Sequence, residues 1–157
     1  MDMNRFKPMF DFERLYWSPF TRRRGFDEER WVTVWHQFDG RPESTGIPII
    51  DSVVQHLHEG RAVTNVAIEY GISNSDLSAV LRVFTGMSTL ELEHRWRLRV
   101  VDDLLRYTNL RISDIARRCG YRSTTALSRS VIKQTKQSPT ARRHSLRQSG
   151  DLGKFER

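Results

Sequence analysis

Residues 112–129 read ISDIARRCGYRSTTALSR, and this stretch decides the fold. Its first half has apolar residues at three- and four-residue spacings, the period of one face of a helix, and predicts a helix over Ile112–Cys119. Gly120 follows directly and can adopt the left-handed backbone conformation that ends a helix. A second helix is predicted over Ser123–Thr135. The stretch therefore predicts two short helices joined by a tight turn.

The same pattern occurs once earlier in the chain. Helices are predicted over Val63–Tyr70 and Asn74–Phe84, with Gly71 in the turn between them and Ser73 as the cap of the second. The two segments match residue by residue: Ala67 with Ala116 and Gly71 with Gly120 at an offset of 49, and Leu77 with Leu127, Ser78 with Ser128 and Ser88 with Ser138 at an offset of 50. The slip of one residue falls in the turn, so we interpret the segments as two copies of one helical hairpin.

A long helix is predicted between the two hairpins. Ser88 and Glu91 have the spacing of a capping box, and the helix that they start should run to about Tyr107, a length of roughly 30 Å. Another helix is predicted over Pro48–Glu59, and Ser138 with Pro139 should open a last short one. From about Ser145 the chain is polar and expected to be disordered. The sequence thus predicts an all-α fold of two helix-turn-helix subdomains joined by a long linker helix.

Positive charge is concentrated in the last third of the chain. The formal net charge is +7 with a sequence pI of about 10.2. Residues 111–157 carry twelve Lys and Arg against three Asp and Glu, whereas residues 47–110 carry six against eight. Such an excess is either a solvated face or a surface that contacts phosphates.

A helix that projects from a helix-turn-helix hairpin fits the major groove of B-DNA. A linker helix of roughly 30 Å would separate two such helices by close to one duplex turn of about 34 Å, so both could enter successive major grooves. Arg129 could pair with a guanine or form a structural salt bridge. The candidate DNA-binding residues are Asn74, Ser75, Ser78, Arg82, Ser123, Thr124, Thr125, Ser128, Arg129 and Lys133.

An ordered series of short motifs covers about 100 residues and resembles the AraC/XylS family of transcription regulators. The motifs are Leu77-Ser78, Gly86-Met87-Ser88, Arg97-Leu98, Leu104-Leu105, Ile112-Ser113-Asp114-Ile115-Ala116, Cys119-Gly120-Tyr121, Leu127-Ser128-Arg129 and Ser138-Pro139. The resemblance implies a seven-helix bundle with two DNA-reading modules and a regulator that binds double-stranded DNA sequence-specifically. Four positions depart from the family pattern: Lys136 replaces the usual glycine, Val131 a phenylalanine, Val101 an alanine and Ala79 a polar or basic base-reading residue.

Several classes of protein are disfavoured by what the sequence contains. Cys119 is the single cysteine, so an intramolecular disulfide and a cysteine-built zinc site are excluded. We interpret it as a buried thiol rather than a redox group. No metal quartet, nucleophile–base motif or phosphate loop is present, and no apolar run reaches the roughly 18 residues of a membrane span. We therefore expect a cytoplasmic protein that is not an enzyme and has no catalytic residues, metal or cofactor.

Residues 1–46 are assigned to an N-terminal arm with a linker, residues 47–147 to the DNA-binding domain and residues 148–157 to a disordered tail. The arm contains ten of the sixteen aromatic residues. Spacing within it suggests a helix over Asp27–Phe38 that docks on the domain, contacts a second copy of the chain or binds another protein. The polar linker at 39–46 suggests that a chain lacking residues 1–40 would remain folded.

The arm is too short for the barrel-like ligand domain of many family members, so we do not expect a small-molecule effector. RNA polymerase or a second copy of the chain are its candidate partners. An alternative function follows from the same arm: a DNA-binding accessory protein whose aromatic arm recruits a protein to a DNA-processing complex.

Overall fold

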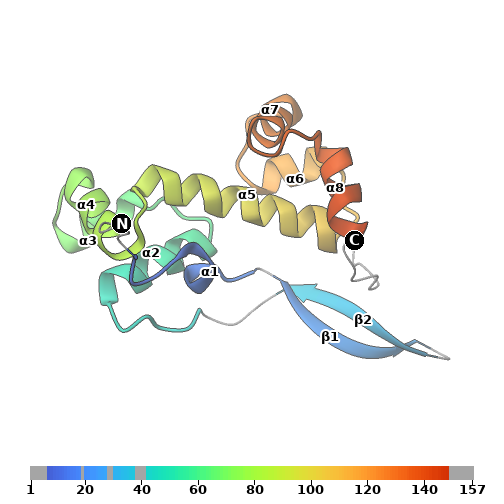
Figure 1. Cartoon of the computed structure of the whole chain (residues 1–157), viewed down its shortest axis with the longest axis horizontal. Coiled ribbons are helices and arrows are strands. Elements are labelled where there is room, and N and C mark those ends of the chain that lie inside the picture. The colour runs from blue at the N-terminus through green and yellow to red at the C-terminus, as the bar shows by residue number, and fades with distance from the viewer. Residues whose placement is uncertain (1–6, 19, 28–29, 38–41, 149–157) are drawn as a thin grey trace, which may run out of the picture. The chain divides into compact units, whose positions relative to one another are not determined.

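The computed structural model describes residues 7–18, 20–27, 30–37 and 42–148. Its elements (Figure 1) are α1 (Phe12–Leu15), β1 (Phe20–Asp27), β2 (Arg30–Gln37), α2 (Pro48–His58), α3 (Thr64–Tyr70), α4 (Asn74–Thr85), α5 (Thr89–Tyr107), α6 (Ile112–Arg118), α7 (Thr124–Thr135) and α8 (Pro139–Gln148). They form two compact units. Unit 1 takes its described residues from Met1–Trp17 and Gly40–Trp96, and unit 2 from Ser18–Asp39 and Arg97–Arg157. Within the described residues, no helix is both long and apolar enough to span a bilayer.

The two predicted helix-turn-helix hairpins are present as α3–α4 in unit 1 and α6–α7 in unit 2. Gly71 and Gly120 have left-handed φ values of 64° and 77°. Just after these glycines, the amides of Ile72 and Tyr121 donate to the carbonyls of Ala67 and Ala116 at 3.0 and 2.9 Å. Leu77 and Leu127 are fully buried. The two halves of the internal repeat therefore share their turn geometry and hydrogen bonds as well as their sequence.

Helix α5 begins as the capping box predicts. The Glu91 amide donates to Ser88 Oγ at 3.2 Å, and the Ser88 amide donates to the Glu91 carboxylate at 3.4 Å. The helix has 19 residues, of which Thr89–Trp96 belong to unit 1 and Arg97–Tyr107 to unit 2.

The core of unit 2 lies between α5, α6, α7 and α8. Leu105, Ile115, Leu127 and Val131 are completely buried in it. Burial of aliphatic side chains of this size contributes roughly 1.5–3 kcal/mol each. The partly buried residues around this core are Leu98, Val100, Leu110, Ile112, Cys119, Tyr121 and Leu146.

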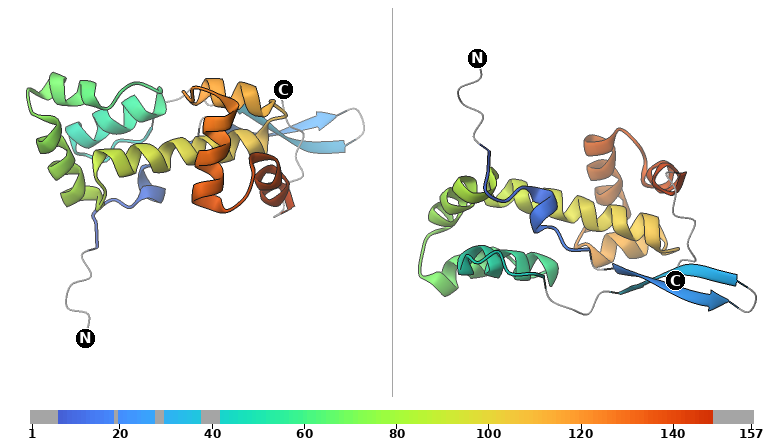
Figure 2. Two further views of the ribbon diagram at one scale, coloured as in Figure 1. Left: turned by 90° about the horizontal axis from the view of Figure 1, so that it is seen from above. Right: turned by 60° about the horizontal axis from the view of Figure 1, so that its bottom comes forward.

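The helix predicted over Asp27–Phe38 is wrong. Asp27 and Arg30–Gln37 belong instead to an antiparallel hairpin, whose strands lie side by side in both views of Figure 2, and Phe38 lies outside the described residues. The segment Trp31–Trp35 consists of two tryptophans around three β-branched residues, and both kinds of residue favour strands. A spacing of four between two tryptophans fits both a helix face and a strand face, so the spacing could not discriminate between them.

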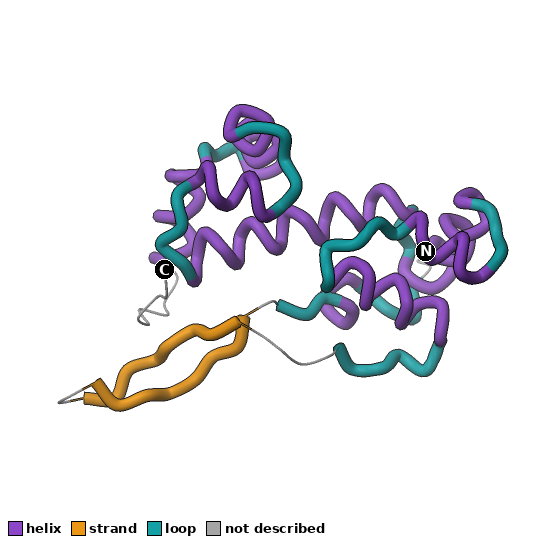
Figure 3. Tube along the Cα trace, turned by 180° about the vertical axis from the view of Figure 1, so that it is seen from behind, coloured by secondary structure: helices purple, strands orange, loops and turns teal. Residues whose placement is uncertain are grey.

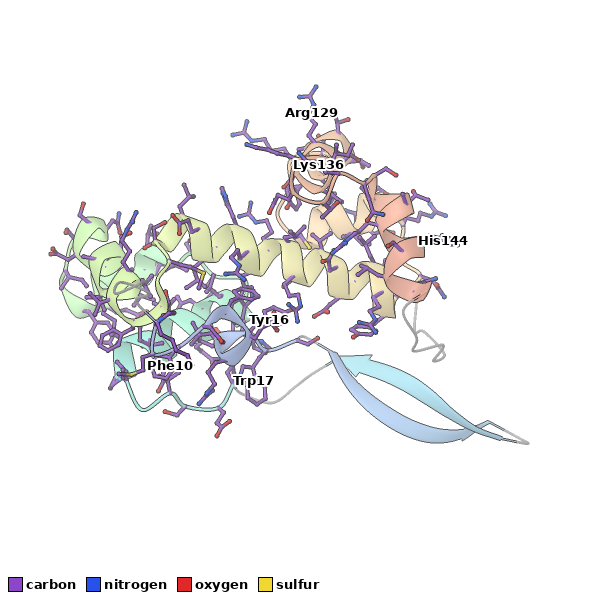
Figure 4. All side chains as sticks on the ribbon, viewed as in Figure 1. Phe10, Tyr16, Trp17, Arg129, Lys136 and His144 are labelled. Carbon is purple, nitrogen blue, oxygen red and sulfur yellow. The ribbon has the colours of Figure 1, made fainter. Side chains whose placement is uncertain are left out.

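The start of the arm is part of unit 1, contrary to the expected independence of the arm. Phe10, Phe12 and Leu15 are buried, with 8%, 4% and 2% of their surfaces exposed. The Phe12 ring meets Trp96 of α5 edge to face, with 6.1 Å between the ring centroids. The Phe10 amide donates to the carbonyl of Phe84 in α4 at 3.0 Å. Figure 4 shows Phe10 and Tyr16 beside the helices of this unit.

Helix α8 is longer than the sequence suggested. Residues 145–148 were expected to be disordered but continue the helix to Gln148, and residues 149–157 lie outside the described part of the chain. The reason is a contact that local composition does not reveal: Arg147 donates to the carbonyl of Thr108 at 2.6 Å.

Lys136 ends α7 in a left-handed conformation, with φ of 63°. Gly86 ends α4 at the matching position of unit 1, with φ of 74°. Because this conformation costs a residue with a Cβ about 1–2 kcal/mol, we expect Lys136→Gly to stabilise the protein by about 0.5–1 kcal/mol after the greater entropy of glycine in the unfolded chain is subtracted. Urea unfolding followed by circular dichroism measures the change.

Two control variants separate the backbone from the side chain. Lys136→Ala removes the lysine but keeps the Cβ, so it should gain little. Gly86→Ala should lose stability, although its Cβ would meet only Pro8 at an ordinary 3.7 Å. Equal stability of the Gly and Ala variants at position 136 would contradict the backbone argument.

Candidate nucleic-acid interface

The exposed face of α7 carries most of the candidate site. Thr125, Arg129 and Lys133 follow one another at four-residue spacing, so they share a face, and all three are exposed. Leu127 and Val131 hold the opposite face in the core of unit 2. Figure 4 shows Arg129 extending from α7 away from the rest of the unit. The helix therefore presents a row of one hydroxyl and two cations to solvent.

The cations of this row are unpaired. Within the described residues, neither Arg129 nor Lys133 has a hydrogen-bond or ion-pair partner. The structural salt bridge weighed for Arg129 is thus not found in this part of the chain, and its five N–H donors are available to a ligand.

The start of α7 adds short polar side chains. Ser123 is exposed, but its Oγ already accepts a hydrogen bond from the Ala126 amide at 3.0 Å as the helix N-cap. Thr124 is exposed without such a role, and Ser128 is half-buried. Of these three candidates, Thr124 has the freest access to a ligand.

Helix α4 also has an exposed polar face, but with fewer cationic residues than α7. Asn74, Ser75 and Arg82 are exposed. Ser78 is half-buried, and its Oγ accepts a hydrogen bond from the Thr89 amide at 3.4 Å, so it helps to position the start of α5. Arg82 is the one cationic residue of α4.

Three arginines of α8 contribute to the positive charge but are held by α5 and the loop after it. Arg142 binds Asp102 with two nitrogens, at 3.1 and 2.8 Å. This hydrogen bonding raises the pKa of Arg142, with a further contribution from the charge of Asp102. Arg143 donates to the carbonyls of Leu105 and Leu110, at 3.0 and 2.7 Å.

The two hydrogen bonds from Arg143 satisfy backbone carbonyls at and beyond the C-terminus of α5, which have no partner within the helix. Arg147 does the same for Thr108. The net charge of the C-terminal third therefore overstates the charge that a nucleic acid would meet, because Arg142, Arg143 and Arg147 are structural.

Other exposed cations were missing from the sequence-based set of site residues. These cations are exposed in unit 2, and the only sequence feature that pointed to them was the positive charge of the last third of the chain. They are Arg111, Arg118, Arg122 and Lys136. Arg117 is also exposed, but it forms an ion pair with Asp114 at 3.0 Å.

Cys119 is partly buried against the core of unit 2. Burial raises the pKa of its thiol to about 11, although Arg97 and Arg118 nearby act in the opposite direction. Because the thiolate is the nucleophile, iodoacetamide at pH 8 should alkylate Cys119 roughly tenfold or more slowly in the folded protein than in urea. Mass spectrometry over time measures both rates, and equal rates would show that the thiol is not protected.

His56 of α2 is buried and already has neighbours. Its Nδ1 lies 2.8 Å from the carbonyl oxygen of Ser52, and its Nε2 lies 3.2 Å from the carboxylate of Glu69. In the described ranges, no three or more His, Cys, Asp or Glu residues come together as metal ligands would.

Comparison with known proteins agrees with this geometry. Residues 55–145, more than half of the chain, match the family model described as a helix-turn-helix domain. The DNA-binding domain of AdpA, a global transcriptional factor solved in complex with a target DNA, is 27% identical with a TM-score of 0.56, over 68% of this chain and 96% of that one. No curated protein sequence matches the chain.

Two further structures share the fold. The xylose-binding transcription activator XylR is 26% identical with a TM-score of 0.54; the match covers 68% of this chain but 29% of XylR, so the chain spans less than a third of that protein. The C-terminal domain of AraT, a response regulator from Geobacillus stearothermophilus, is 24% identical with a TM-score of 0.57, over 71% and 93% of the two chains.

Fold and site together define a double helix-turn-helix protein in which the second helix of each hairpin has an exposed polar face. The chain belongs to the AraC/XylS family of helix-turn-helix transcriptional regulators.

Proposed function

We propose that this chain binds a specific site on double-stranded DNA through α4 and α7 and regulates transcription from it. The observation that carries the proposal is the exposed row on α7, where Arg129 and Lys133 lack partners among the described residues. An arginine in this position can donate two hydrogen bonds to a guanine in the major groove, and a lysine can neutralise a phosphate. Membership of the family and the DNA complex of AdpA support the same function.

The two reading helices are unequal in this proposal. α7 offers two unpaired cations and the exposed hydroxyls of Thr124 and Thr125. α4 offers Arg82 with Asn74 and Ser75, and its exposed Ala79 has no group that can hydrogen-bond to a base. We therefore expect the half-site bound by α7 to dominate affinity and discrimination.

The length of α5 suggests the spacing of the two half-sites. Nineteen residues correspond to about 28 Å of helix, close to the roughly 34 Å of one duplex turn. We infer that one chain can engage two successive major grooves, without a second copy, at an asymmetric site.

Selection of bound duplexes from a random pool tests the function directly. The expected result is an asymmetric motif with two conserved blocks whose centres are about 10 base pairs apart, the block bound by α7 being the stronger. Absence of any enriched motif with folded protein at physiological salt would contradict sequence-specific binding.

A further inference from the structure

Helices α4 and α7 match residue by residue, although their exposed rows differ chemically. In both hairpins (Figure 3, helices purple and loops teal) the second helix has twelve residues, begins after a serine N-cap and ends at a residue with a left-handed φ. The offset of 50 that pairs Leu77 with Leu127 holds along both helices. The row of α7 therefore has a counterpart in α4: Thr125 corresponds to Ser75, Arg129 to Ala79 and Lys133 to Val83.

Each row faces away from the core of its own unit. Ala79 of α4 is exposed, and Val83 has 61% of its surface exposed. The side of each helix that lies opposite its row is completely buried, and the buried residues are Leu77 and Leu81 in α4 and Leu127 and Val131 in α7. At the two positions where α7 presents cations to solvent, α4 therefore presents small aliphatic side chains.

Helix α4 has no surplus charge with which to hold a phosphate backbone. It contains one carboxylate and one guanidinium, from Asp76 and Arg82, and both residues are exposed. Helix α7 contains two cations and no carboxylate. Uncharged contacts are therefore left to supply most of the discrimination by α4, and the centre of its row offers only methyl groups.

Thymine is the base that presents a methyl group in the major groove, and apolar side chains such as alanine contact this group. A protein partner fits the row of α4 less well, because apolar docking patches usually cover roughly a few hundred Å² or more. Val83 follows the charged Arg82 in the chain, and the row beyond Ala79 continues to the hydroxyl of Ser75. The small apolar step thus matches a base edge better than a protein surface.

We propose that Ala79 and Val83 contact the 5-methyl groups of pyrimidines, which in unmodified DNA are those of thymine, in the half-site bound by α4. Removing one methyl group from water corresponds to roughly a fourfold gain in affinity. Pairing of Arg129 with a guanine has a larger effect, so α7 still dominates. The inference rests on the proposed function, because it needs α4 to enter the major groove.

Base analogues that differ by one methyl group test the proposal. Each thymine of the duplex obtained by selection is replaced in turn with uracil, which removes the methyl group and keeps the hydrogen-bonding edge. Wild type should bind about fourfold more weakly when a thymine contacted by the row is replaced. Ala79→Ser with Val83→Ser replaces both aliphatic side chains with hydroxyls. This variant should bind the thymine duplex more weakly than wild type does and should show no loss at the same uracil.

Ile68→Ala is the matched control, because Ile68 of α3 is 77% exposed in the same unit but lies outside the row. It should keep the affinity of wild type for the thymine duplex and the same loss at uracil. Circular dichroism confirms that each variant is folded. Each cytosine is also compared with 5-methylcytosine, which distinguishes the two sources of the methyl group. A preference for thymine over uracil supports thymine, whereas a preference for 5-methylcytosine alone assigns the row to modified DNA.

Two results would overturn the inference. One is a wild-type affinity that changes with none of the methyl groups. The other is a loss at uracil that is equal in wild type and in the double serine variant, since an effect of uracil on duplex shape would weaken both proteins alike. Absence of any enriched duplex would remove the proposed function and the inference together, whereas an enriched duplex that is insensitive to its methyl groups would remove the inference alone.

Discussion

Replacing Phe12 with alanine is expected to destabilise unit 1 by about 3–5 kcal/mol, the usual cost of removing a buried aromatic side chain. Phe12 is 4% exposed and contacts Trp96, Tyr16 and the guanidinium of Arg95, which lies 4.5 Å from the ring centre. Loss of the ring leaves a cavity and removes aromatic and cation–π contacts. Domains of this size are stable by only about 5–15 kcal/mol, so the change should shift urea unfolding by a large part of its range.

Met9 offers a matched control in the same segment. It is 67% exposed, so Met9→Ala should change stability by no more than about 0.5 kcal/mol. Deletion of residues 1–17 should destabilise unit 1 at least as much as Phe12→Ala. An unchanged unfolding midpoint for this deletion would show that the arm is dispensable, as the sequence alone had suggested.

Replacing Arg129 with alanine is expected to cost about 1–3 kcal/mol of DNA-binding free energy. If Arg129 pairs with a guanine, the loss is concentrated on the selected site and discrimination at that base is relaxed. If it contacts a phosphate, affinity for every duplex falls alike. Titration against the selected and a scrambled duplex at fixed salt separates the two cases.

Alanine variants of two other arginines serve as controls for Arg129→Ala. Arg82→Ala should have a smaller effect, because the face of α4 is poorer in donors. Arg117→Ala removes an exposed charge that is already paired with Asp114, and it should change affinity least. Circular dichroism confirms that each variant is folded, and a loss for Arg82→Ala that equals or exceeds that of Arg129→Ala would refute the unequal readers.

Local sequence patterns predicted most of the helical fold. Turn glycines, serine caps and apolar spacings act over a few residues, so Gly71, Ser73 and Gly120 could be interpreted from their neighbours alone. The repeat strengthened these predictions because each half is an independent instance of the same geometry.

The predictions failed where the structure of a segment depends on residues far away in the sequence. The tryptophan spacing fits strand and helix equally well, and pairing with Phe20–Asp27 settles the strand. Burial of Phe12 depends on Trp96, far along the sequence. The charge count could not reveal that Arg143 is bound to backbone carbonyls 33 and 38 residues earlier. For the candidate site, sequence named α4 and α7, while exposure distinguishes free groups such as Arg129 from engaged ones such as Ser78.

The arginine contacts of α8 also determine the order in which the two units can finish folding during synthesis on the ribosome. Phe12 leaves the ribosome early, but its ring contact with Trp96 can form only after Trp96 has emerged. The hydrogen bond to the carbonyl of Thr108 can form only after Arg147 has emerged. At roughly 5–20 residues per second, the interval between Trp96 and Arg147 lasts about 3–10 s. During that interval unit 1 can fold while unit 2 lacks the groups that complete the C-terminal end of α5, so a ribosome stalled before α7 has emerged would display the first reading helix without the second.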